Sequence, residues 1–256
     1  AVVFETGDDV GGTWYWNRYP GARCDAESLA YSFSFSAELE HEWEWSERYS
    51  PQSEILDYAR HVSERFDLRR DIRFNTKVTT AHFQDESNTW IIESNRGDEV
   101  EARFCIMATG CLSVPKLPDI PRLDEFEGYL YQASKWPHEP VSFKGQRVGI
   151  IGTGSSGIQA IPVIAAEADH LTVFQRTPNF SVPARNAPLD DAWVKQYKEN
   201  YRDHRHSYRH GLSSGFGDLT IAAQLDAHEP TEFNKMTETE ALELLEFNWN
   251  RGGAVF

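Results

Sequence analysis

The sequence predicts an α/β fold, and three neighbouring segments lead to this prediction. Residues 147–151 form a short apolar run typical of a buried strand, and the glycine-rich turn Gly152–Gly157 follows directly. Residues 155–168 have the composition of a helix, and residues 171–175 that of a second strand. A strand, a glycine turn and a helix in this order form the phosphate-binding unit of a Rossmann-type fold, so a dinucleotide site is expected here.

Each glycine of this turn has an expected role. Gly152 permits the tight turn, Gly154 lets the backbone approach a pyrophosphate, and Gly157 lets the helix pack closely on the strand. The helix N-terminus adds free N–H groups and the positive end of its dipole. Where an NAD site carries an acid after the second strand, Arg176 and Thr177 stand instead, which suits the 2′-phosphate of NADPH. The alternative is a glycine turn that only packs, with Arg176 a solvated charge.

Composition and length exclude several classes of protein. The chain has 256 residues, enough for one large or two modest domains. No apolar run approaches the ~18 residues that a membrane-spanning helix needs. The net charge of −15 argues against nucleic-acid binding, which requires a cationic surface. Three sparse cysteines without metal-binding spacing predict a reduced, cytoplasmic protein with no metal site.

The ends of the sequence indicate a piece of a longer protein, because it starts without Met and stops at Phe256 without a terminating signal. Residues 1–5 are apolar and then acidic. An acid at this place is what a Rossmann strand offers to an adenosine ribose, although an ordinary charged strand end explains Glu5 better when it is taken alone. The loop at residues 11–25 is dense in glycine and aromatics, so it either packs under another segment or covers a flat ligand.

Apolar spacing and turn residues predict the remaining elements. A helix is expected from Ser50 to Phe66, and the prolines at 115, 118 and 121 mark a domain boundary. The expected strands cover residues 72–83, 89–94 and 100–107, with a hairpin turn at 95–98. The expected helices near the end cover residues 190–208 and 238–249, with a glycine and serine break at 212–217. Histidines 204, 206 and 210 are better explained by a solvated helix face than by a metal site.

Together these motifs resemble the NADPH-dependent, FAD-containing Baeyer–Villiger monooxygenases, in the branch of the phenylacetone and cyclic-ketone enzymes. The resemblance covers nearly the whole chain and is carried by residues 11–25, 108–110, 152–159 and 174–178. It implies an α/β fold with two Rossmann-like domains, for FAD and NADPH, and a helical insertion, truncated at both ends. The expected division is a partial FAD domain at 1–114, an NADPH domain with its linker at 115–186, and a partial helical insertion at 187–256.

A second family pattern, Phe-x-Gly-x-x-x-His-x-x-x-Trp-Pro/Asp, lies in the linker between the nucleotide domains. Phe126, Gly128, Trp136 and Pro137 match it in register, and Gln132 stands at the histidine position. In the family this histidine is tied to catalytic domain motion. Glutamine forms hydrogen bonds but is not protonated near neutral pH. The departure leaves the expected fold intact and places full coupling of NADPH oxidation to oxygenation in doubt.

The resemblance also assigns cofactor residues. Those near FAD are Glu5 at the ribose, Gly12, Thr13, Trp14, Tyr15, Trp16 and Tyr31 around the isoalloxazine and its chain, Asp25 near the flavin, and Val78 near the adenine. Those near NADPH are Gly152, Thr153, Gly154, Ser155, Ser156, Gly157, Ile158 and Gln159 at the pyrophosphate, Arg176 and Thr177 at the 2′-phosphate, and Arg23, Cys24 and Asp25 near the nicotinamide.

Asp25 is the catalytic candidate, because the resemblance places its carboxylate beside an active-site arginine that would lie beyond Phe256. The alternative for Asp25 is a loop cap that accepts backbone N–H groups. The family's first glycine motif, for FAD, would precede residue 1. The isolated chain is therefore expected to bind FAD poorly and to be inactive.

The implied reaction inserts one oxygen atom of O2 next to a ketone carbonyl, giving an ester or lactone through NADPH, FAD and a C4a-peroxyflavin. The expected partners are a small ketone and O2, with no membrane or nucleic acid, and the expected state is a monomer. Two alternatives stay open: a flavin monooxygenase that oxygenates nitrogen or sulfur, whose linker usually lacks Trp-Pro, and an uncoupled NADPH-binding flavoprotein, which Gln132 makes plausible. A disulfide reductase is excluded, because the sequence has no Cys-x-x-Cys or Cys-x4-Cys pair.

Overall fold

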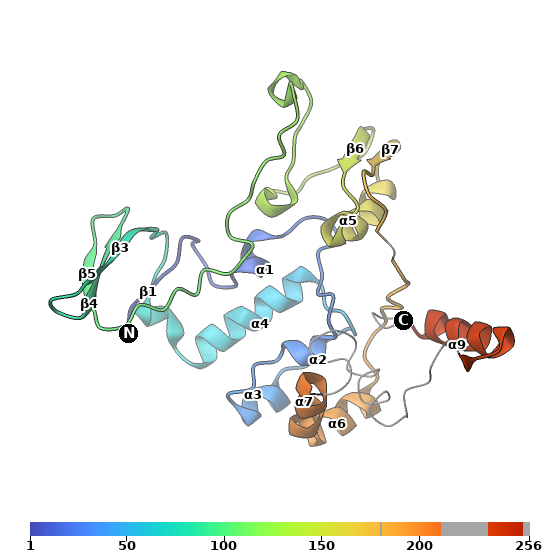
Figure 1. Ribbon diagram of the computed structural model, residues 1–256, viewed down its shortest axis with the longest axis horizontal. Helices are drawn as coiled ribbons and strands as arrows, with labels where there is room; N and C mark the ends of the chain where they lie inside the picture. Colours follow the sequence, from blue (N-terminus) through green and yellow to red (C-terminus); the bar gives the residue numbers. More distant parts are fainter. Residues whose placement is uncertain (180, 211–234, 253–256) are drawn as a thin grey trace. The chain divides into compact units, whose positions relative to one another are not determined.

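A computed structural model describes residues 1–179, 181–210 and 235–252 (Figure 1). The chain forms two compact units that alternate along the sequence. Unit 1 comprises Ala1–Ala22, Gln52–Val148 and Gln159–Leu171, and unit 2 comprises Arg23–Pro51, Gly149–Ile158 and Thr172–Phe256. The three sequential domains stay a prediction. The expected break at 212–217 lies outside the described residues.

Unit 1 contains a short pair of parallel strands and the long helix α4 (Gln52–Arg65). Strand β1 (Val3–Phe4) pairs with β2 (Ile72–Arg73), which follows α4 and the 3₁₀ turn η1 (Leu68–Asp71). Helix α4 buries Ile55, Tyr58 and Val62, spaced three or four residues apart. The helix expected over residues 50–66 is confirmed, although it begins at Gln52.

The strand expected over residues 72–83 is wrong, because the structure divides it into β2 and β3 (Val78–Gln84). Between them Asn75 takes a left-handed φ of 53°, and its N–H donates to Gly7 O at 2.8 Å. The N–H of Thr76, which is 1% exposed, donates to Glu5 O at 2.8 Å. These bonds to the β1 end turn the chain away from its first partner, so a single straight strand cannot form.

Strand β3 starts a three-stranded antiparallel sheet with β4 (Thr89–Ser94) and β5 (Glu99–Ala102). The expected strand at 89–94 is confirmed, and the hairpin turn contains Gly97 at a φ of 82°. The expected strand over 100–107 ends early, at Ala102. Ala102 pairs with Trp90, the second residue of β4, so the sheet offers almost no backbone for the residues that follow.

Residues 103–135 form a long extended arm, drawn in green in Figure 1. It contains the two 3₁₀ turns η2 (Leu123–Glu125) and η3 (Ala133–Lys135). Its outgoing and returning legs are joined where Gln132 Nε2 donates to Lys116 O at 3.0 Å. Large apolar side chains of the outgoing leg are exposed, with Phe104 at 80% and Ile106 at 88%.

The predicted order of strand, turn, helix and strand is confirmed, but the expected burial of the first strand is wrong: Ile151 is 68% exposed, and the described sheet has only two strands. The unit consists of β6 (Arg147–Ile151), α5 (Ser155–Ala165) and β7 (His170–Phe174), and β6 and β7 are hydrogen-bonded neighbours. Helix α5 ends three residues before the expected residue 168. Its Pro162 has no N–H for the helical ladder.

Helix α1 (Thr13–Trp16) lies in unit 1, and the remaining α-helices of the described residues lie in unit 2. They are α2 (Ser28–Tyr31), α3 (Ala37–Glu42), α6 (Asp191–Glu199), α7 (Tyr201–His210) and α9 (Glu238–Arg251). The single helix expected over 190–208 is wrong, because Asn200 leaves helical geometry at φ −121° and ψ 29° and ends α6. The expected helix at 238–249 is confirmed by α9.

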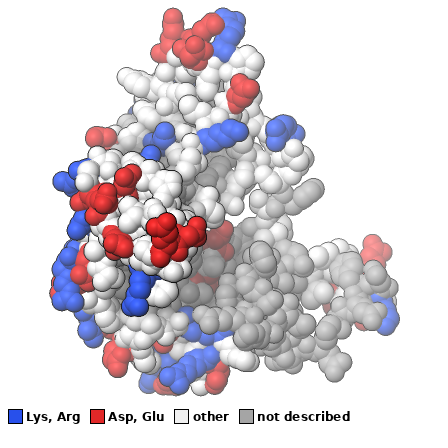
Figure 2. Space-filling view, turned by 60° about the vertical axis from the view of Figure 1, so that its left-hand side comes forward, with Lys and Arg blue, Asp and Glu red and all other residues white. Residues whose placement is uncertain are grey.

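The core of unit 2 contains Tyr197 and Leu39, which are 1% and 0% exposed, and a 2.7 Å ion pair joins Arg205 to Glu40. Across the described part of the chain, no helix is long and apolar enough to cross a membrane, and no cluster of three metal-ligating side chains occurs. Figure 2 shows acidic and basic side chains interspersed over the described part of one face.

Candidate nucleotide-binding site

The glycine turn after β6 has the geometry that its three predicted roles require. Gly152 has a φ of 102°, which favours glycine. A Cβ at Gly157 would lie 2.5 Å from Gly152 O, so only glycine lets α5 begin this close to the turn. A Cβ at Gly154 would meet no atom within 4 Å, so the backbone there borders open space. A pyrophosphate fits this combination of a tight turn and an open approach.

The end of β7 holds the turn in place. Gly152 N–H donates to Phe174 O at 2.9 Å, and Gln175 Nε2 donates to Thr153 Oγ1 at 2.8 Å. Asn179 Nδ2 donates to Thr153 O at 2.7 Å, and Thr153 is only 8% exposed. Gln175 and Asn179 were not among the residues predicted from the sequence, although their position in the five residues after the second strand is the signal that points to them.

Arg176 and Thr177 lie between these two holding residues, and both are exposed. The structure therefore brings the basic strand end beside the glycine turn within unit 2. Ser155 and Ile158 are exposed and Ser156 is half-buried in the first turn of α5. The N–H groups of a helix start and a nearby guanidinium suit a nucleotide with an additional phosphate.

Gln159, which follows Ile158 in α5, is the member of the pyrophosphate set that belongs to unit 1, and its place at the pyrophosphate stays a prediction. Its side-chain Oε1 accepts a 2.8 Å hydrogen bond from Tyr19 OH. Tyr19 lies on the loop that the sequence assigned to a flat ligand.

That loop turns sharply into α1. Gly11 and Gly12 have φ values of 119° and 50°, and Trp14 N–H and Trp16 N–H donate back to their carbonyls at 3.0 and 3.1 Å. A Cβ at Gly12 would meet no atom within 4 Å, so this backbone also borders open space. Thr13 and Trp16 are exposed, and Trp14 is half-buried. The arrangement fits a planar ligand that approaches the start of α1.

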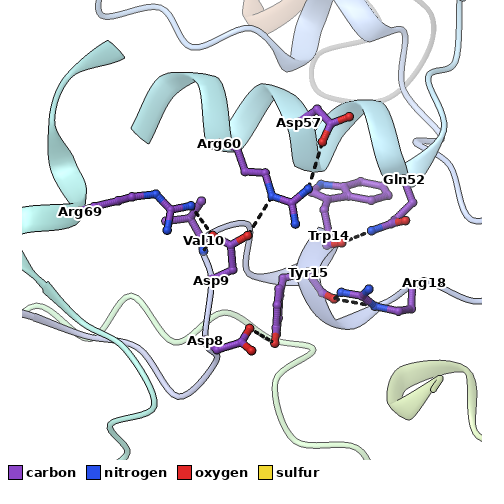
Figure 3. A network of polar contacts seen from close by, with 10 residues as sticks. All are labelled: Asp8, Asp9, Val10, Trp14, Tyr15, Arg18, Gln52, Asp57, Arg60 and Arg69. Atoms are coloured by element: carbon purple, nitrogen blue, oxygen red, sulfur yellow. Dashed lines mark hydrogen bonds and ion pairs between the residues drawn. The ribbon is translucent and has the colours of Figure 1, made fainter. Parts of the chain in front are cut away.

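Tyr15 anchors this loop to the interior of unit 1 (Figure 3). Its side chain is 6% exposed, and its hydroxyl donates to Asp8 Oδ1 at 2.5 Å. Burial, together with the hydrogen bond to the Asp8 carboxylate, raises the pKa of the Tyr15 hydroxyl. Arg18 Nε donates to Tyr15 O at 3.1 Å. Tyr15 is thus a structural member of the set that the resemblance assigns to FAD.

An acidic residue with two arginines fixes the segment before Gly11 (Figure 3). Asp9 accepts from Arg60 Nε at 2.8 Å, from Arg69 Nη2 and from Val10 N–H at 2.8 Å. Burial alone would raise the pKa of the Asp9 carboxyl, but the hydrogen bonds from Arg60, Val10 and Arg69 together lower it below its usual value. Arg60 also contacts Asp57 Oδ1 at 3.1 Å. No sequence motif points to Asp9, Arg60 or Arg69.

The remaining unit 1 residues assigned to FAD are Glu5 and Val78. Glu5 is half-buried, and its Oε1 accepts Gly7 N–H at 2.7 Å, as a carboxylate at a strand end does when it caps the following turn. Val78 is 40% exposed at the start of β3.

The last four assigned residues are Arg23, Cys24 and Asp25, at the end of the loop, and Tyr31, and all four lie in unit 2. Arg23 Nη1 lies 3.5 Å from Tyr49 O and 3.5 Å from Glu47 Oε2. Cys24 is 2% exposed, and burial raises the pKa of its thiol to about 11. Asp25 is exposed and receives no hydrogen bond from a described residue, so nothing in that part of the chain supports the loop-cap alternative. Tyr31 is half-buried at the end of α2.

The linker pattern lies at the returning leg of the arm, in unit 1. Phe126 is 60% exposed. A Cβ at Gly128 would lie only 2.5 Å from the Phe126 ring, so the ring packs against the space that a side chain there would fill. The Trp136 ring lies 5.2 Å from that of Tyr131 and 6.2 Å from that of Phe143, with Pro137 half-buried beside it. The Gln132 side-chain amide donates to Lys116 O on the outgoing leg of the arm.

Comparison with known sequences places the chain in a family. The profile described as "Pyridine nucleotide-disulphide oxidoreductase" matches residues 28–209, and the chain belongs to this family. A cyclohexanone 1,2-monooxygenase of Acinetobacter is 45% identical over 199 residues, covering 78% of this chain and 36% of the relative. A Baeyer–Villiger monooxygenase of Pseudooceanicola batsensis is 39% identical over 253 residues, covering 99% and 45%. The chain thus spans less than half the length of these relatives.

Solved structures agree with the sequence comparison. An oxidised steroid monooxygenase bound to NADP matches with a TM-score of 0.85 and 49% identity, over 98% of this chain and 46% of that one. The protein called OTEMO, in complex with FAD and NADP, matches with a TM-score of 0.86 and 36% identity, over 98% and 47%. The α/β fold with Rossmann-type nucleotide-binding units and the resemblance to Baeyer–Villiger monooxygenases are confirmed.

Proposed function

We propose that the protein containing this chain is an NADPH- and FAD-dependent monooxygenase that inserts one oxygen atom of O2 next to a ketone carbonyl. The observation that carries the proposal is the open glycine turn at Gly154, held against the strand end that presents Arg176 and Thr177. The names of the relatives support the reaction class, and the nucleotides bound to the similar structures support both cofactors.

The NADPH part of the proposal assigns a task to each group of the turn. The first N–H groups of α5 and the backbone at Gly154 bind the pyrophosphate. The Arg176 guanidinium and the Thr177 hydroxyl bind the 2′-phosphate, which NADH lacks. Gln175 and Asn179 keep the turn in the required conformation through Thr153.

The FAD part of the proposal uses the loop before α1 and the end of β1. Glu5 orients a ribose hydroxyl, and the open backbone at Gly12 admits the ligand. Asp9 and Tyr15 position the loop. Bound FAD supplies the oxygen-activating chemistry, once NADPH has reduced it. Asp25, exposed and unbonded among the described residues, holds the guanidinium of an active-site arginine elsewhere in the protein.

The finer predictions from the sequence belong to this proposal. The partners are a small ketone and O2, and the protein is a monomer. Its cysteine usage favours a cytoplasmic location. The linker Phe126–Pro137 moves during catalysis. The Gln132 amide forms hydrogen bonds at the position where the family pattern has a histidine.

The test uses the natural protein that contains this chain, loaded with FAD and NADPH under ¹⁸O-labelled O2, with cyclic and aryl ketones. Mass spectrometry is expected to find one labelled oxygen in an ester or lactone. NADPH consumption with only hydrogen peroxide as product contradicts ketone oxygenation and favours the uncoupled flavoprotein. Labelled N-oxide or sulfoxide from amine and thioether substrates, without ester, favours the nitrogen- or sulfur-oxygenating alternative.

A further inference from the structure

One hydrogen bond in unit 1 joins the loop assigned to FAD to the helix assigned to NADPH. The Tyr19 hydroxyl donates to Gln159 Oε1 at 2.8 Å, and the two residues lie 140 positions apart in the sequence. Both side chains are half-buried, so water competes for this bond less than at an exposed site. In Figure 1 the segment that leaves α1 runs to α5.

The backbone of the same loop packs on the same turn of α5. Gly21 has a φ of 79°, and a Cβ there would overlap the backbone carbonyl of Gln159. The same Cβ would lie 3.0 Å from Val163 Cγ2, one helical turn further on. The absence of a side chain at Gly21 therefore lets the loop lie directly against α5, in the position that the Tyr19 bond requires.

The loop makes further contacts on both sides of this bond. Ala22 N–H donates to Tyr19 O at 3.0 Å, and Gln52 N–H donates to Ala22 O at 2.8 Å, which ties the loop to the start of α4. Tyr15 packs edge-on against the His138 ring with centroids 5.4 Å apart, next to the linker residues Trp136 and Pro137. These contacts connect the Gly11–Trp16 segment to α5 through Tyr19 and Gly21.

We propose that Tyr19 is a positioning residue that couples FAD binding at Gly11–Trp16 to NADP⁺ binding at the start of α5. The inference rests on the proposed function, because it uses both cofactors. NADP⁺ at the turn orders α5 and Gln159, the Tyr19–Gln159 bond then holds the loop docked, and the docked loop retains FAD. Coupling between two ligands is reciprocal, so bound FAD also strengthens NADP⁺ binding.

The test measures FAD release from the holoenzyme, by recovery of flavin fluorescence, with and without saturating NADP⁺. NADP⁺ is expected to slow FAD release in the unmodified protein. We call the ratio of the FAD release rates without and with NADP⁺ the NADP⁺ protection. Tyr19→Phe keeps the ring and removes the hydroxyl, and it is expected to lower this ratio roughly five-fold, as for loss of one net hydrogen bond. The Kd of NADP⁺, from titration of the flavin spectrum, is expected to rise by a similar factor.

Two further variants separate coupling from general stability. Tyr201→Phe removes a hydroxyl that donates to Leu29 O at 2.7 Å in unit 2, and it is expected to lower the melting temperature without changing the NADP⁺ protection. Gln159→Glu keeps an acceptor for Tyr19 and is expected to retain the protection, whereas Gln159→Leu loses it. Adding Tyr19→Phe to Gln159→Leu is expected to change nothing more.

The outcomes distinguish the inference from the function on which it rests. A protein that binds neither FAD nor NADP⁺ contradicts the proposed function. A protein that binds both, but in which Tyr19→Phe leaves the NADP⁺ protection unchanged, overturns the coupling role of Tyr19 alone.

Discussion

Gly154 and Gly157 belong to one turn but face different surroundings, and their alanine variants should fail in different ways. Gly157→Ala forces a Cβ against the Gly152 carbonyl and is expected to lower the free energy of unfolding by about 1–3 kcal/mol. Gly154→Ala fills only open space and is expected to leave the melting temperature unchanged while raising the Kd of NADP⁺ by roughly ten-fold, or about 1.4 kcal/mol. Thermal unfolding and nucleotide titration on both variants check this. Equal melting temperatures for the two would contradict the packing role of Gly157.

Asp9 supplies a prediction about acid stability. Its pKa is lower in the folded chain than the ordinary value of 3.8, so its contribution to stability is complete above that value and is lost as the pH falls through the lower folded pKa. Asp9→Asn is expected to lower the free energy of unfolding by about 2 kcal/mol at pH 7, and by progressively less below pH ~4. Denaturant titrations across this pH range measure the difference.

Asp57→Asn is the matched control for Asp9, because it removes a carboxylate that bonds the same Arg60 from a 61% exposed position. Screening by water limits its expected effect to at most about 0.5 kcal/mol. If the two variants are equally destabilised, the lower exposure of the Asp9 side chain, 16% against 61% for Asp57, is not what makes its ion pair stronger.

At the scale of elements, α4 supports the cofactor loop as well as the core. Leu56 is 5% exposed and its Cδ1 lies against Gly11, so it connects helix packing to the loop's conformation. Leu56→Ala is expected to cost about 2–5 kcal/mol in unfolding free energy. Glu64→Ala, on the exposed side of the same helix, should change it by less than about 0.5 kcal/mol. Denaturant unfolding checks both, and a Leu56→Ala cost near that of Glu64→Ala would refute the packing argument.

Elements with strong local patterns could be predicted from the sequence, and those decided by distant pairing could not. Strand β6 and helix α4 have apolar spacings that identify them alone. The breaks at Asn75 and Ala102 depend on bonds to β1 and on the register of β4, and no local signal announces them. Within the site, the glycine turn was predicted, whereas the Asp9–Arg60 and Tyr19–Gln159 bonds join residues 51 and 140 positions apart.

At the scale of the whole molecule, the arm exposes a large apolar surface. Ile106 and Val114 are 88% and 90% exposed, an arrangement that marks an interaction surface or an aggregation hazard. The 256-residue chain expressed alone is expected to self-associate and to bind a hydrophobic dye. Ile106→Lys combined with Val114→Lys should reduce both effects. Light scattering after size exclusion measures the mass, and a monomer that binds no dye would contradict this prediction.

The distribution of the three cysteines has a practical consequence. Cys24 is buried with a thiol pKa near 11 and is therefore protonated and unreactive at neutral pH, and Cys105 is half-buried. Cys111 is exposed on the extended arm. A maleimide fluorophore will therefore attach first at residue 111, without any engineered mutation, and a change in its emission when nucleotides are added would report a change in the surroundings of the arm.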